Sequence, residues 1–275
     1  MDLYTKLIKR PFIFKRLTGT TIEEFDSIIQ KLQHVWFRRH ERKKKIAGRP
    51  YGVGNLENQL VCLLLYYRTY TTQLFIGWLF SVDDATISRS IKRLEPILAQ
   101  VVAIKKERKL SHKEVEELIV DCTEQPIQRP KKRQKQYYSG KKKRHTIKTE
   151  IQVNRKGRII KVSKPHAGKK HDMQIRKESG ILPQDCEVYG DSGYQGLRDT
   201  HKKAKIPIKK SKNRPLNNTS KAYNRALAHI RIGVEHKIRE LKIFCILAQT
   251  YRNPKSRYGV KMKIIAGIVN IKNGF

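Results

Sequence analysis

The chain has 275 residues, which is enough for one large domain or two modest domains with a hydrophobic core. Its 61 lysines and arginines outnumber 24 aspartates and glutamates, and the formal net charge of +37 makes a polyanion the expected partner. The longest apolar runs, 60–67 and 74–80, fall well short of the roughly 20 residues that a membrane-spanning helix needs, so no membrane partner is expected.

The cysteines and the first residues indicate a reduced, cytoplasmic setting. No two cysteines form a Cys-x-x-Cys pair, which argues against a disulfide framework or a zinc site. Basic residues interrupt the one apolar stretch near the N-terminus, so no signal peptide is expected. The free thiols are expected at Cys62, Cys122, Cys186 and Cys245.

Residues 1–50 are predicted to form a helical segment. Thr21 precedes two glutamates, as a helix N-cap does, and apolar residues recur at helical spacing from Phe25 to Trp36. A basic run at 38–45 then leads into a Gly-Arg-Pro linker. The run is either a solvated helix end or an arm that contacts phosphates, and both interpretations stay open.

Residues 51–110 are predicted to form an all-α helix-turn-helix DNA-binding domain. The pattern predicts helices at 56–67, 72–80 and 85–94, with a tight turn and an N-cap at 81–84. The third helix begins with small polar residues and continues with basic ones, which suits a recognition helix in a major groove. An ordinary amphipathic helix of a small bundle is the alternative, and the net charge favours DNA binding. The residues expected to contact DNA are Thr86, Ser88, Arg89, Lys92 and Arg93.

A strand at 117–123, which carries Asp121, precedes a strongly basic stretch. From Arg129 to Lys148 the chain holds ten lysines and arginines and no acid, with two tyrosines in the middle. Because this stretch lies between two strand-like segments, we expect a surface excursion that orders against phosphates; a merely solvated loop is the alternative. The DNA contacts expected here are Lys141, Lys142, Lys143 and Arg144.

The remainder of the chain alternates strands and helices. Residues 146–153 and 158–162 alternate at period two around an Asn-Arg-Lys-Gly turn, which predicts a hairpin. A short helix follows, with Asp172 as its expected N-cap. Beyond it, the pattern predicts a strand at 187–191, a helix at 196–203, a strand at 206–208, a long helix at 223–244 and an apolar tail helix at 261–270. This order argues for a mixed α/β sheet of about five strands flanked by helices.

Three acids are expected to converge on one edge of this sheet. Asp121 and Asp191 each follow a strand-like run, and open α/β sheets bind ligands at the carboxyl ends of their strands. On a wheel of the long helix, Glu235 lies at the rim of the apolar arc, between Arg231 and Lys242. The arc itself consists of Leu227, Ile230, Val234, Ile238 and Leu241.

Carboxylates supply the oxygen ligands that a hard cation such as Mg²⁺ prefers, and the two basic neighbours of Glu235 would meet phosphate. Two such ions ~3.5–4 Å apart can activate an attacking oxygen and stabilise a leaving one at a phosphodiester. For Glu235, the third expected ligand, the alternative is an ordinary ion pair with its basic neighbours Arg231 and Lys242. Further acids near the expected site are Glu124, Glu187 and Glu240.

These residues resemble the DDE-type insertion-sequence transposases, in the insertion-sequence family usually numbered five. The resemblance covers residues 50–270, and its motifs are specific together although each is weak alone. Related transposases have a tyrosine at the position of Ala228, so any role of that tyrosine is absent or moved. The motifs are Val120-Asp121-Cys122-Thr123-Glu124, Tyr138-Ser139-Gly140-Lys141-Lys142-Lys143-Arg144-His145-Thr146, Gly190-Asp191-Ser192-Gly193-Tyr194-Gln195-Gly196 and Arg231-x3-Glu235-x6-Lys242.

The resemblance implies a ribonuclease-H-like DDE catalytic domain at 115–275, with Asp121, Asp191 and Glu235 as the metal-binding triad. It also implies that the helix-turn-helix helps to recognise terminal inverted repeats. The expected activity is DNA cleavage at those repeats and transfer of the 3′-hydroxyl ends to target DNA, with Mg²⁺ as cofactor and Mn²⁺ as a substitute. The expected partner is double-stranded DNA, bound by a homodimer at the DNA ends, in a bacterial, nucleoid-associated setting.

Two other functions fit the same sequence. A nuclease of the same fold would hydrolyse DNA without strand transfer. A non-enzymatic DNA-binding protein descended from such an element would keep the basic surface only, and the presence of all three acids argues against it.

Overall fold

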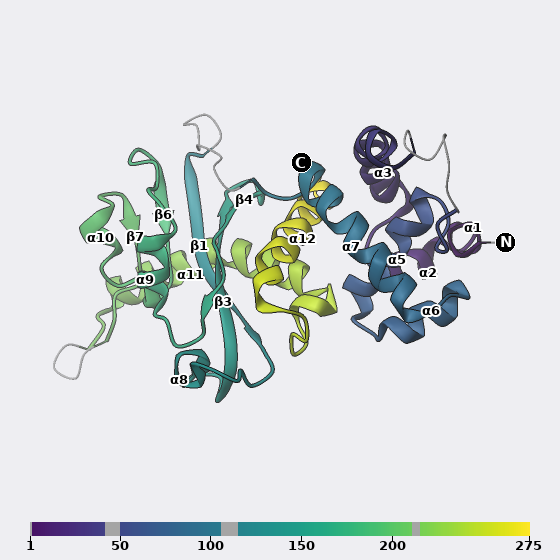
Figure 1. Ribbon diagram of the computed structural model, residues 1–275. Coiled ribbons are helices and arrows are strands. Elements are labelled where there is room, and N and C mark those ends of the chain that lie inside the picture. The colour runs from purple at the N-terminus through teal and green to yellow at the C-terminus, as the bar shows by residue number, and fades with distance from the viewer. Residues whose placement is uncertain (1, 42–49, 106–114, 211–214) are drawn as a thin grey trace. The chain divides into compact units, whose positions relative to one another are not determined.

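The computed structural model describes residues 2–41, 50–105, 115–210 and 215–275 (Figure 1). The chain forms two compact units. The helical unit contains Met1–Ala103, Lys242–Gln249 and Lys263–Gly274. The sheet unit contains Ile104–Leu241, Thr250–Met262 and Phe275.

The first helices follow from local sequence. Thr21 caps α3 (Ile22–Trp36) in a capping box: Thr21 Oγ1 accepts from the Glu24 N–H (3.2 Å), and the Glu24 carboxylate accepts from the Thr21 N–H (2.8 Å). The predicted apolar stripe of this helix is buried. Most of the basic run at 38–45 lies outside the described residues. The neighbouring elements are α1 (Leu3–Ile8), α2 (Pro11–Thr18) and the π-helical turn η1 (Phe37–Glu41).

Three further helices form the expected helix-turn-helix arrangement: α5 (Leu56–Thr69), α6 (Gln73–Phe80) and α7 (Asp84–Val101). Ser81 ends α6 in the left-handed region (φ 54°), and Asp83 caps α7 by accepting from the Thr86 N–H (2.6 Å). Gly77 permits the tight turn, because a Cβ there would lie 2.5 Å from the Val82 carbonyl oxygen.

The third helix is longer than predicted. The prediction ended it near Leu94, whereas α7 continues to Val101. Proline disrupts a helix interior because it lacks an N–H, yet here the helix passes through Pro96. Ile97 and Leu98 beyond the proline are buried and extend the apolar stripe, so packing holds the last turns in place.

Segments from the far end of the sequence complete the helical unit. Phe244 is buried against Gly19, where an added Cβ would lie 2.9 Å from the ring. The later part of α12 (Tyr258–Lys272) packs on the end of α7, since a Cβ at Gly267 would lie 1.9 Å from the Val102 carbonyl oxygen. Both ends of the chain therefore contribute to one helical core.

The sheet is built around β1 (Glu117–Pro126). This strand pairs antiparallel with β3 (Arg144–Asn154) on one side and parallel with β6 (Glu187–Tyr189) on the other. Beyond β6 lies β7 (Ala204–Lys205), and the outer edge of β3 pairs with β2 (Tyr138–Ser139), β4 (Ile159–Val162) and β5 (His166–Ala167). Among the described residues the mixed sheet has seven strands, more than expected, because two-residue strands leave no period-two pattern.

Several elements of the sheet unit differ from the prediction in their bounds. The helix expected at 196–203 is only α10 (Leu197–Thr200), and the strand expected at 206–208 is β7, which lies earlier. Buried His201 explains both, because its Nε2 lies 2.8 Å from the Pro183 carbonyl oxygen and turns the chain out of the helix. The other elements are α8 (Gln134–Tyr137), α9 (Asp172–Glu178), η3 (Ser192–Tyr194), η5 (Lys255–Arg257) and α11 (Asn218–Lys242), which begins before the expected Tyr223.

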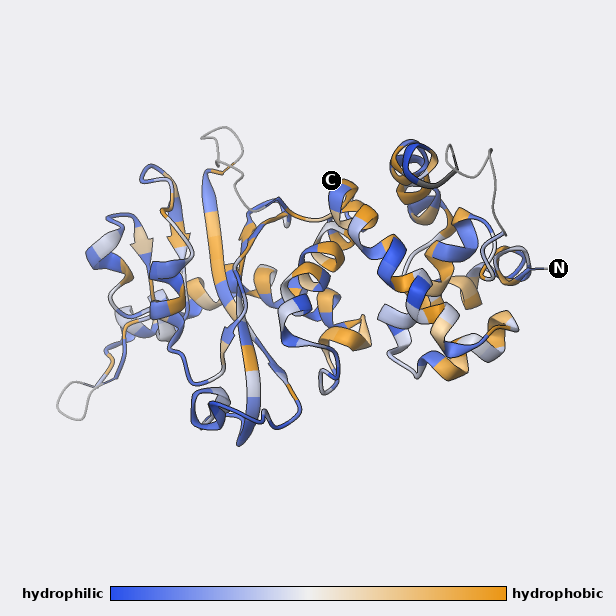
Figure 2. Ribbon diagram, viewed as in Figure 1, coloured by the Kyte–Doolittle hydropathy of each residue, from blue (hydrophilic) through white to orange (hydrophobic). Residues whose placement is uncertain are grey.

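The middle of β1 is largely apolar (Figure 2), and its apolar residues are buried. Leu118 and Val120 belong to a core that also includes residues of α9 and α10, whereas Ile119 faces α11 on the other side. The fold is thus the predicted α/β mixed sheet with flanking helices, preceded by an all-α helix-turn-helix region, consistent with a ribonuclease-H-like core. Within the described ranges no helix combines the length and hydrophobicity needed to span a bilayer. All four cysteines are free thiols, as expected.

Candidate active site

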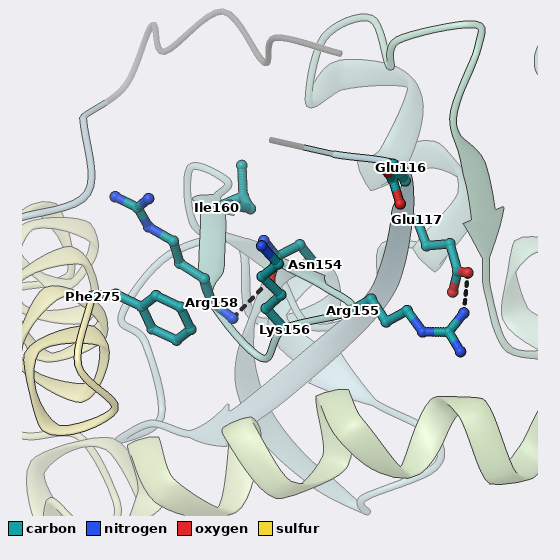
Figure 3. Close-up of a pocket in the computed structure, with 8 residues that line it drawn as sticks. All are labelled: Glu116, Glu117, Asn154, Arg155, Lys156, Arg158, Ile160 and Phe275. Carbon is teal, nitrogen blue, oxygen red and sulfur yellow. Dashed lines mark hydrogen bonds and ion pairs between the residues drawn. The ribbon is translucent and has the colours of Figure 1, made fainter. Parts of the chain in front are cut away.

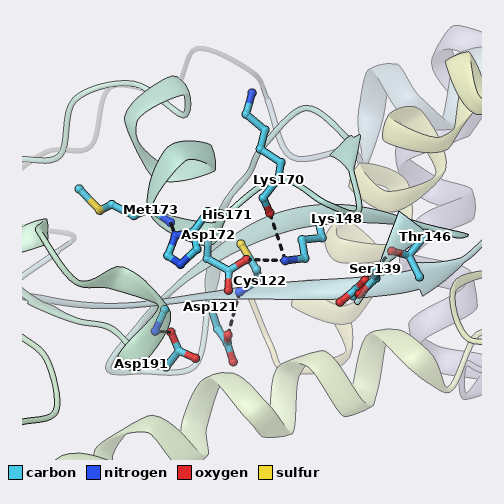
Figure 4. Close-up of polar contacts among 12 residues, drawn as sticks. Asp121, Cys122, Ser139, Thr146, Lys148, Lys170, His171, Asp172, Met173 and Asp191 are labelled. Carbon is cyan, nitrogen blue, oxygen red and sulfur yellow. Dashed lines mark hydrogen bonds and ion pairs between the residues drawn. The ribbon is translucent and has the colours of Figure 1, made fainter. Parts of the chain in front are cut away.

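Asp121 and Asp191 lie just beyond the parallel pairing of two adjacent strands. Asp191 follows the end of β6, but the expectation that Asp121 ends its strand is wrong, because β1 continues to Pro126 in its antiparallel pairing with β3. The parallel pairing of β1 and β6 ends at Ile119 and Tyr189, so both acids follow it at the carboxyl edge of the sheet (Figure 4). Asp121 Oδ1 accepts from the Cys122 N–H (2.7 Å). Asp191 caps η3, where its Oδ1 accepts from the Gly193 N–H (2.8 Å). The structure therefore brings the two acids to one edge.

The environment of Asp121 disfavours its negative charge. Burial raises the pKa of Asp121 to about 6, and the nearby carboxylates of Asp191 and Asp172 add to this rise. The guanidinium of Arg231 opposes it. A buried carboxylate in the field of two others is a site where a cation would lower the free energy of the folded protein.

The helix α11 presents a narrower buried face than the wheel predicted. Leu227, Val234 and Leu241 recur every seventh residue and are buried as a single row. The prediction was wrong for Ile230, which lies off this row and is 39% exposed. Lys237 is buried instead and donates to Glu240 (2.8 Å), so this acid already has a partner on its own helix.

Arg231 lies between two of the three predicted acids. Its Nη2 is 3.7 Å from Asp121 Oδ2 and 3.9 Å from Glu235 Oε1. The side chains of Asp121 and Arg231 are mostly buried, whereas that of Glu235 is 55% exposed. The ion pair of Glu235 with Arg231 is therefore present, as the simpler alternative anticipated, and Arg231 also links Glu235 to Asp121. Lys242 is exposed at the end of α11.

Within the described part of the chain, no three His, Cys, Asp or Glu side chains are close enough to form a ready metal site. The donor chemistry nevertheless fits a hard divalent cation, because the acids at this edge offer carboxylate oxygens and leave Asp121 poorly compensated. For Asp121 and Glu235 to share an ion, the guanidinium between them has to move aside.

Sequence reasoning missed Asp172 as part of this edge. The prediction made Asp172 the N-cap of its helix, but His171 is the N-cap, and its Nδ1 accepts from the Met173 N–H (3.4 Å). The Asp172 carboxylate instead accepts from Lys148 Nζ (3.1 Å) on β3, as Figure 4 shows. The same Nζ donates to the Lys170 carbonyl oxygen (3.1 Å). The alternation of polar residues in β3 was the available signal, but it did not identify the partner.

A second ion pair joins the same helix and strand. Arg176 donates to Glu150, and both side chains are almost completely buried. Arg176 also donates to the Gly180 carbonyl oxygen (2.6 Å), and Gln152 Nε2 donates to Glu150 (3.0 Å). Burial raises the pKa of Glu150, and the Arg176 charge opposes this rise. The helix α9 is thus fixed to β3 next to the acidic edge.

The basic excursion at 129–148 is folded rather than irregular. It contains α8 and β2, and Lys255 Nζ lies 4.0 Å from the centroid of the Tyr137 ring. Ser139 is buried, and its Oγ accepts from the Lys142 N–H (3.2 Å). All four predicted DNA contacts of this excursion, Lys141, Lys142, Lys143 and Arg144, are exposed.

The residues of α7 that are predicted to contact DNA differ in their solvent exposure. Arg89 and Lys92 are exposed, whereas Thr86, Ser88 and Arg93 are half-buried. Thr86 Oγ1 donates to Asp83 (3.0 Å) and accepts from Arg89 (3.3 Å). The Arg93 guanidinium lies 3.9 Å from the centroid of the Tyr51 ring, which fixes its direction.

A separate hollow lies at the amino end of β1, away from the acidic edge (Figure 3). Glu117 and Arg155 form an ion pair at its rim, and the Arg158 guanidinium lies 5.9 Å from the centroid of the Phe275 ring. Since Glu117 and Asp121 are at different ends of the parallel β1–β6 pairing, this hollow is no part of the candidate site.

Comparison with known proteins identifies the family of this chain. The sequence model of the DDE superfamily endonuclease matches residues 120–271, and that of the helix-turn-helix of DDE superfamily endonuclease matches residues 53–103. The chain is 36% identical over 263 residues to a probable transposase for insertion sequence element IS702 from Microchaete diplosiphon, covering 94% of this chain and 93% of that protein. No solved structure shows significant similarity. Endonucleases of this superfamily generally use divalent metal ions. The chain therefore belongs to the DDE superfamily endonucleases, as a transposase with a helix-turn-helix domain.

Proposed function

We propose that this protein cleaves DNA at the terminal inverted repeats of its insertion sequence and transfers the 3′-hydroxyl ends to target DNA. The observation that carries the proposal is the position of Asp121 and Asp191 just beyond the parallel pairing of β1 and β6, in a chain of the DDE superfamily. Glu235 is connected to this pair through Arg231.

In this proposal Asp121, Asp191 and Glu235 hold Mg²⁺, for which Mn²⁺ can substitute. The bound ions would activate the attacking oxygen and stabilise the leaving oxygen of the phosphodiester. Water and then the DNA 3′-hydroxyl are the nucleophiles, and no covalent bond between protein and DNA forms. Arg231, which contacts Asp121 and Glu235, would bind a phosphate oxygen if a metal ion held those two carboxylates, and its planar donor group is well suited to phosphate.

Basic residues of both units are proposed to contact DNA, with different roles. The recognition helix α7 offers Thr86, Ser88, Arg89, Lys92 and Arg93 to the inverted repeat. Phosphates are bound by Lys141, Lys142, Lys143, Arg144, Arg231 and Lys242. Because two element ends have to be joined, two copies of the chain act together as a homodimer on DNA, in the cytoplasm and close to the nucleoid.

The test uses a labelled duplex that carries the element end, incubated with the full chain and either Mg²⁺ or EDTA. We expect nicking and strand transfer in Mg²⁺ for the wild type, and a loss of both for Asp191→Ala. Asp199→Ala is the matched control, since Asp199 is an exposed acid on α10.

Each other outcome selects another function. Metal-dependent nicking without strand transfer on authentic ends indicates a nuclease of the same fold. If Asp191→Ala kept every DNA-dependent activity, the protein would act by binding DNA alone.

A further inference from the structure

We propose that Asp172 is a fourth carboxylate of this metal site, that it holds the same divalent cation as Asp191, and that Lys148 orients it. The inference rests on the proposed function, to which it adds a residue. It is carried by the close approach of two carboxylates around a glycine and by the way α9 is fixed to β3.

Gly193 separates the two carboxylates. A Cβ added at Gly193 would lie 2.8 Å from Asp172 Oδ2 and 2.9 Å from Asp191 Oδ1. Both contacts are closer than real Cβ atoms make, so a larger residue at position 193 would displace the ends of these two side chains. The backbone does not require glycine here, because φ lies outside the left-handed region. The absence of a side chain at Gly193 therefore leaves room for both carboxylates in their present positions.

The Asp172 carboxylate is held in one orientation. Its Oδ1 accepts from Lys148 Nζ, while Oδ2 is the atom that faces Gly193 and the Asp191 side of the edge. The side chain of Asp172 is 24% exposed and that of Lys148 only 16%. Partial burial on both sides makes this pair better defined than an ion pair on an open surface.

The attachment of α9 supports the same interpretation. Asp172 and Arg176 are four residues apart and lie on one face of the helix, while Lys148 and Glu150 are two apart and lie on one face of β3. Two ion pairs of opposite polarity, Asp172 to Lys148 and Arg176 to Glu150, therefore fix both the rotation and the position of α9. A helix fixed in this way brings Asp172 to the carboxyl edge of the sheet.

The charges at the edge call for a cation. The negative charges of Asp172 and Asp191 both act on Asp121. The cations in ion pairs with the acids at this edge are Lys148 and Arg231, and Arg231 is shared by Asp121 and Glu235. Four carboxylates near two cations leave a net negative charge that a divalent ion would balance.

The first experiment measures Mn²⁺ binding to the full-length chain without DNA, by calorimetry and by the loss of free Mn²⁺ signal in electron paramagnetic resonance. We expect Asp172→Asn and Asp191→Asn each to weaken Mn²⁺ binding about tenfold or more. Glu178→Gln is the matched control, because it removes an acid from the same helix whose ion pairs are with Lys164, Lys170 and His166. Melting temperatures in EDTA show that each variant is folded.

A second variant keeps every carboxylate in place. Gly193→Ala introduces the Cβ that would contact both Asp172 and Asp191, so it should weaken Mn²⁺ binding although no charge changes. Gly140→Ala is its control, because a Cβ at Gly140 meets no atom within 4 Å. Because this Cβ would also meet Asp191, weaker binding by Gly193→Ala supports a shared site together with the Asp172→Asn result, whereas unchanged binding counts against it.

The outcomes separate this inference from the proposed function. If Asp191→Asn weakens Mn²⁺ binding while Asp172→Asn and Gly193→Ala bind like their controls, Asp172 is outside the site and the proposed function stands. If the wild type does not bind Mn²⁺, or if Asp191→Asn binds as well as the wild type, both proposals are overturned.

Discussion

At the scale of single residues, Arg231 has the most consequential position. Its guanidinium is the shared partner of Asp121 and Glu235 and neutralises part of the charge that would attract a metal ion. Arg231→Gln should therefore tighten Mn²⁺ binding in the absence of DNA by about tenfold, or about 1.4 kcal/mol, because it removes a positive charge beside a metal-binding carboxylate. The same change should weaken DNA cleavage by removing a phosphate contact. Calorimetry and the cleavage assay measure the two effects.

The control for this prediction is Arg239→Gln, an equal change of charge at an exposed position of the same helix. It should leave Mn²⁺ binding almost unchanged, since exposed charges are strongly screened by water and salt. Weaker Mn²⁺ binding by Arg231→Gln would mean that this arginine supports the metal site rather than competing with the ion.

His166 gives a second residue-scale prediction, on stability. Burial lowers the pKa of His166, the charges of Lys170 and Lys164 add to the effect, and Glu178 opposes it. Its Nε2 is buried, and no described residue forms a hydrogen bond with it. Below the ordinary histidine pKa, the unfolded chain binds a proton that the folded chain resists, so the free energy of unfolding should fall as the pH drops below about 6.5.

Urea unfolding at a series of pH values checks this prediction. The decline in stability between about pH 7 and pH 5 should be smaller in His166→Gln than in the wild type, because the substituted side chain does not titrate. Equal slopes for the two proteins would show that the folded state takes up the proton as readily as the unfolded chain.

At the scale of elements, the attachment of α9 to β3 is the critical contact. The Arg176–Glu150 pair is almost completely buried, and removing one partner leaves the other charge uncompensated. Arg176→Met should therefore lower the free energy of unfolding by about 3–5 kcal/mol, as breaking a buried ion pair does. The double variant with Glu150→Gln should recover part of this loss, and urea unfolding of all four proteins measures the coupling.

Lys170→Met tests whether burial is the cause. Lys170 also forms an ion pair with an acid of α9, Glu178, but this pair is exposed to solvent. Its removal should have a far smaller effect on unfolding than Arg176→Met. Similar losses for the two substitutions would show that any ion pair of α9 stabilises the unit equally.

Elements with local signals could be predicted from the sequence. The capping box at Thr21, the turn before α7, the 146–162 hairpin, the strand that contains Asp121 and the strand that ends before Asp191 each depend on residues close together in the chain. Such contacts leave a pattern that composition and spacing reveal. The helical stripe of α3 and the positions of two candidate acids were predictable for this reason.

The rest depends on contacts between distant residues. Lys148 and Asp172 are 24 positions apart. Nothing in the sequence near Asp172 indicates that its carboxylate accepts a hydrogen bond from a strand lysine and not from the helix backbone. His201 shifts β7 through a contact with Pro183, 18 positions away. Ile230 is exposed because only a narrow face of α11 is buried. A helical wheel shows which residues share a face but not how wide the buried part of that face is.

At the scale of the whole molecule, not every positive charge is expected to contribute equally to DNA binding. The chain carries a formal net charge of +37, so some affinity for any polyanion is unavoidable. Within the basic excursion at 129–148, residues 141–144 are four consecutive exposed basic residues. They belong to the sheet unit, which also contains the acidic edge. A functional contact must therefore be distinguished from the general charge.

The salt dependence of DNA binding makes this distinction. Replacing Lys141, Lys142, Lys143 and Arg144 together by glutamine should reduce the slope of log K against log salt concentration by up to about 3.6, roughly 0.9 for each phosphate that the protein no longer neutralises. An equal charge change at Lys6, Lys9, Lys15 and Lys31, which are exposed on α1 to α3 or beside them, is the control and should alter the slope much less. Fluorescence anisotropy with a labelled duplex between about 50 and 200 mM salt measures both slopes. Equal changes for the two variants would mean that DNA is attracted by the net charge alone, and that the excursion makes no specific phosphate contacts.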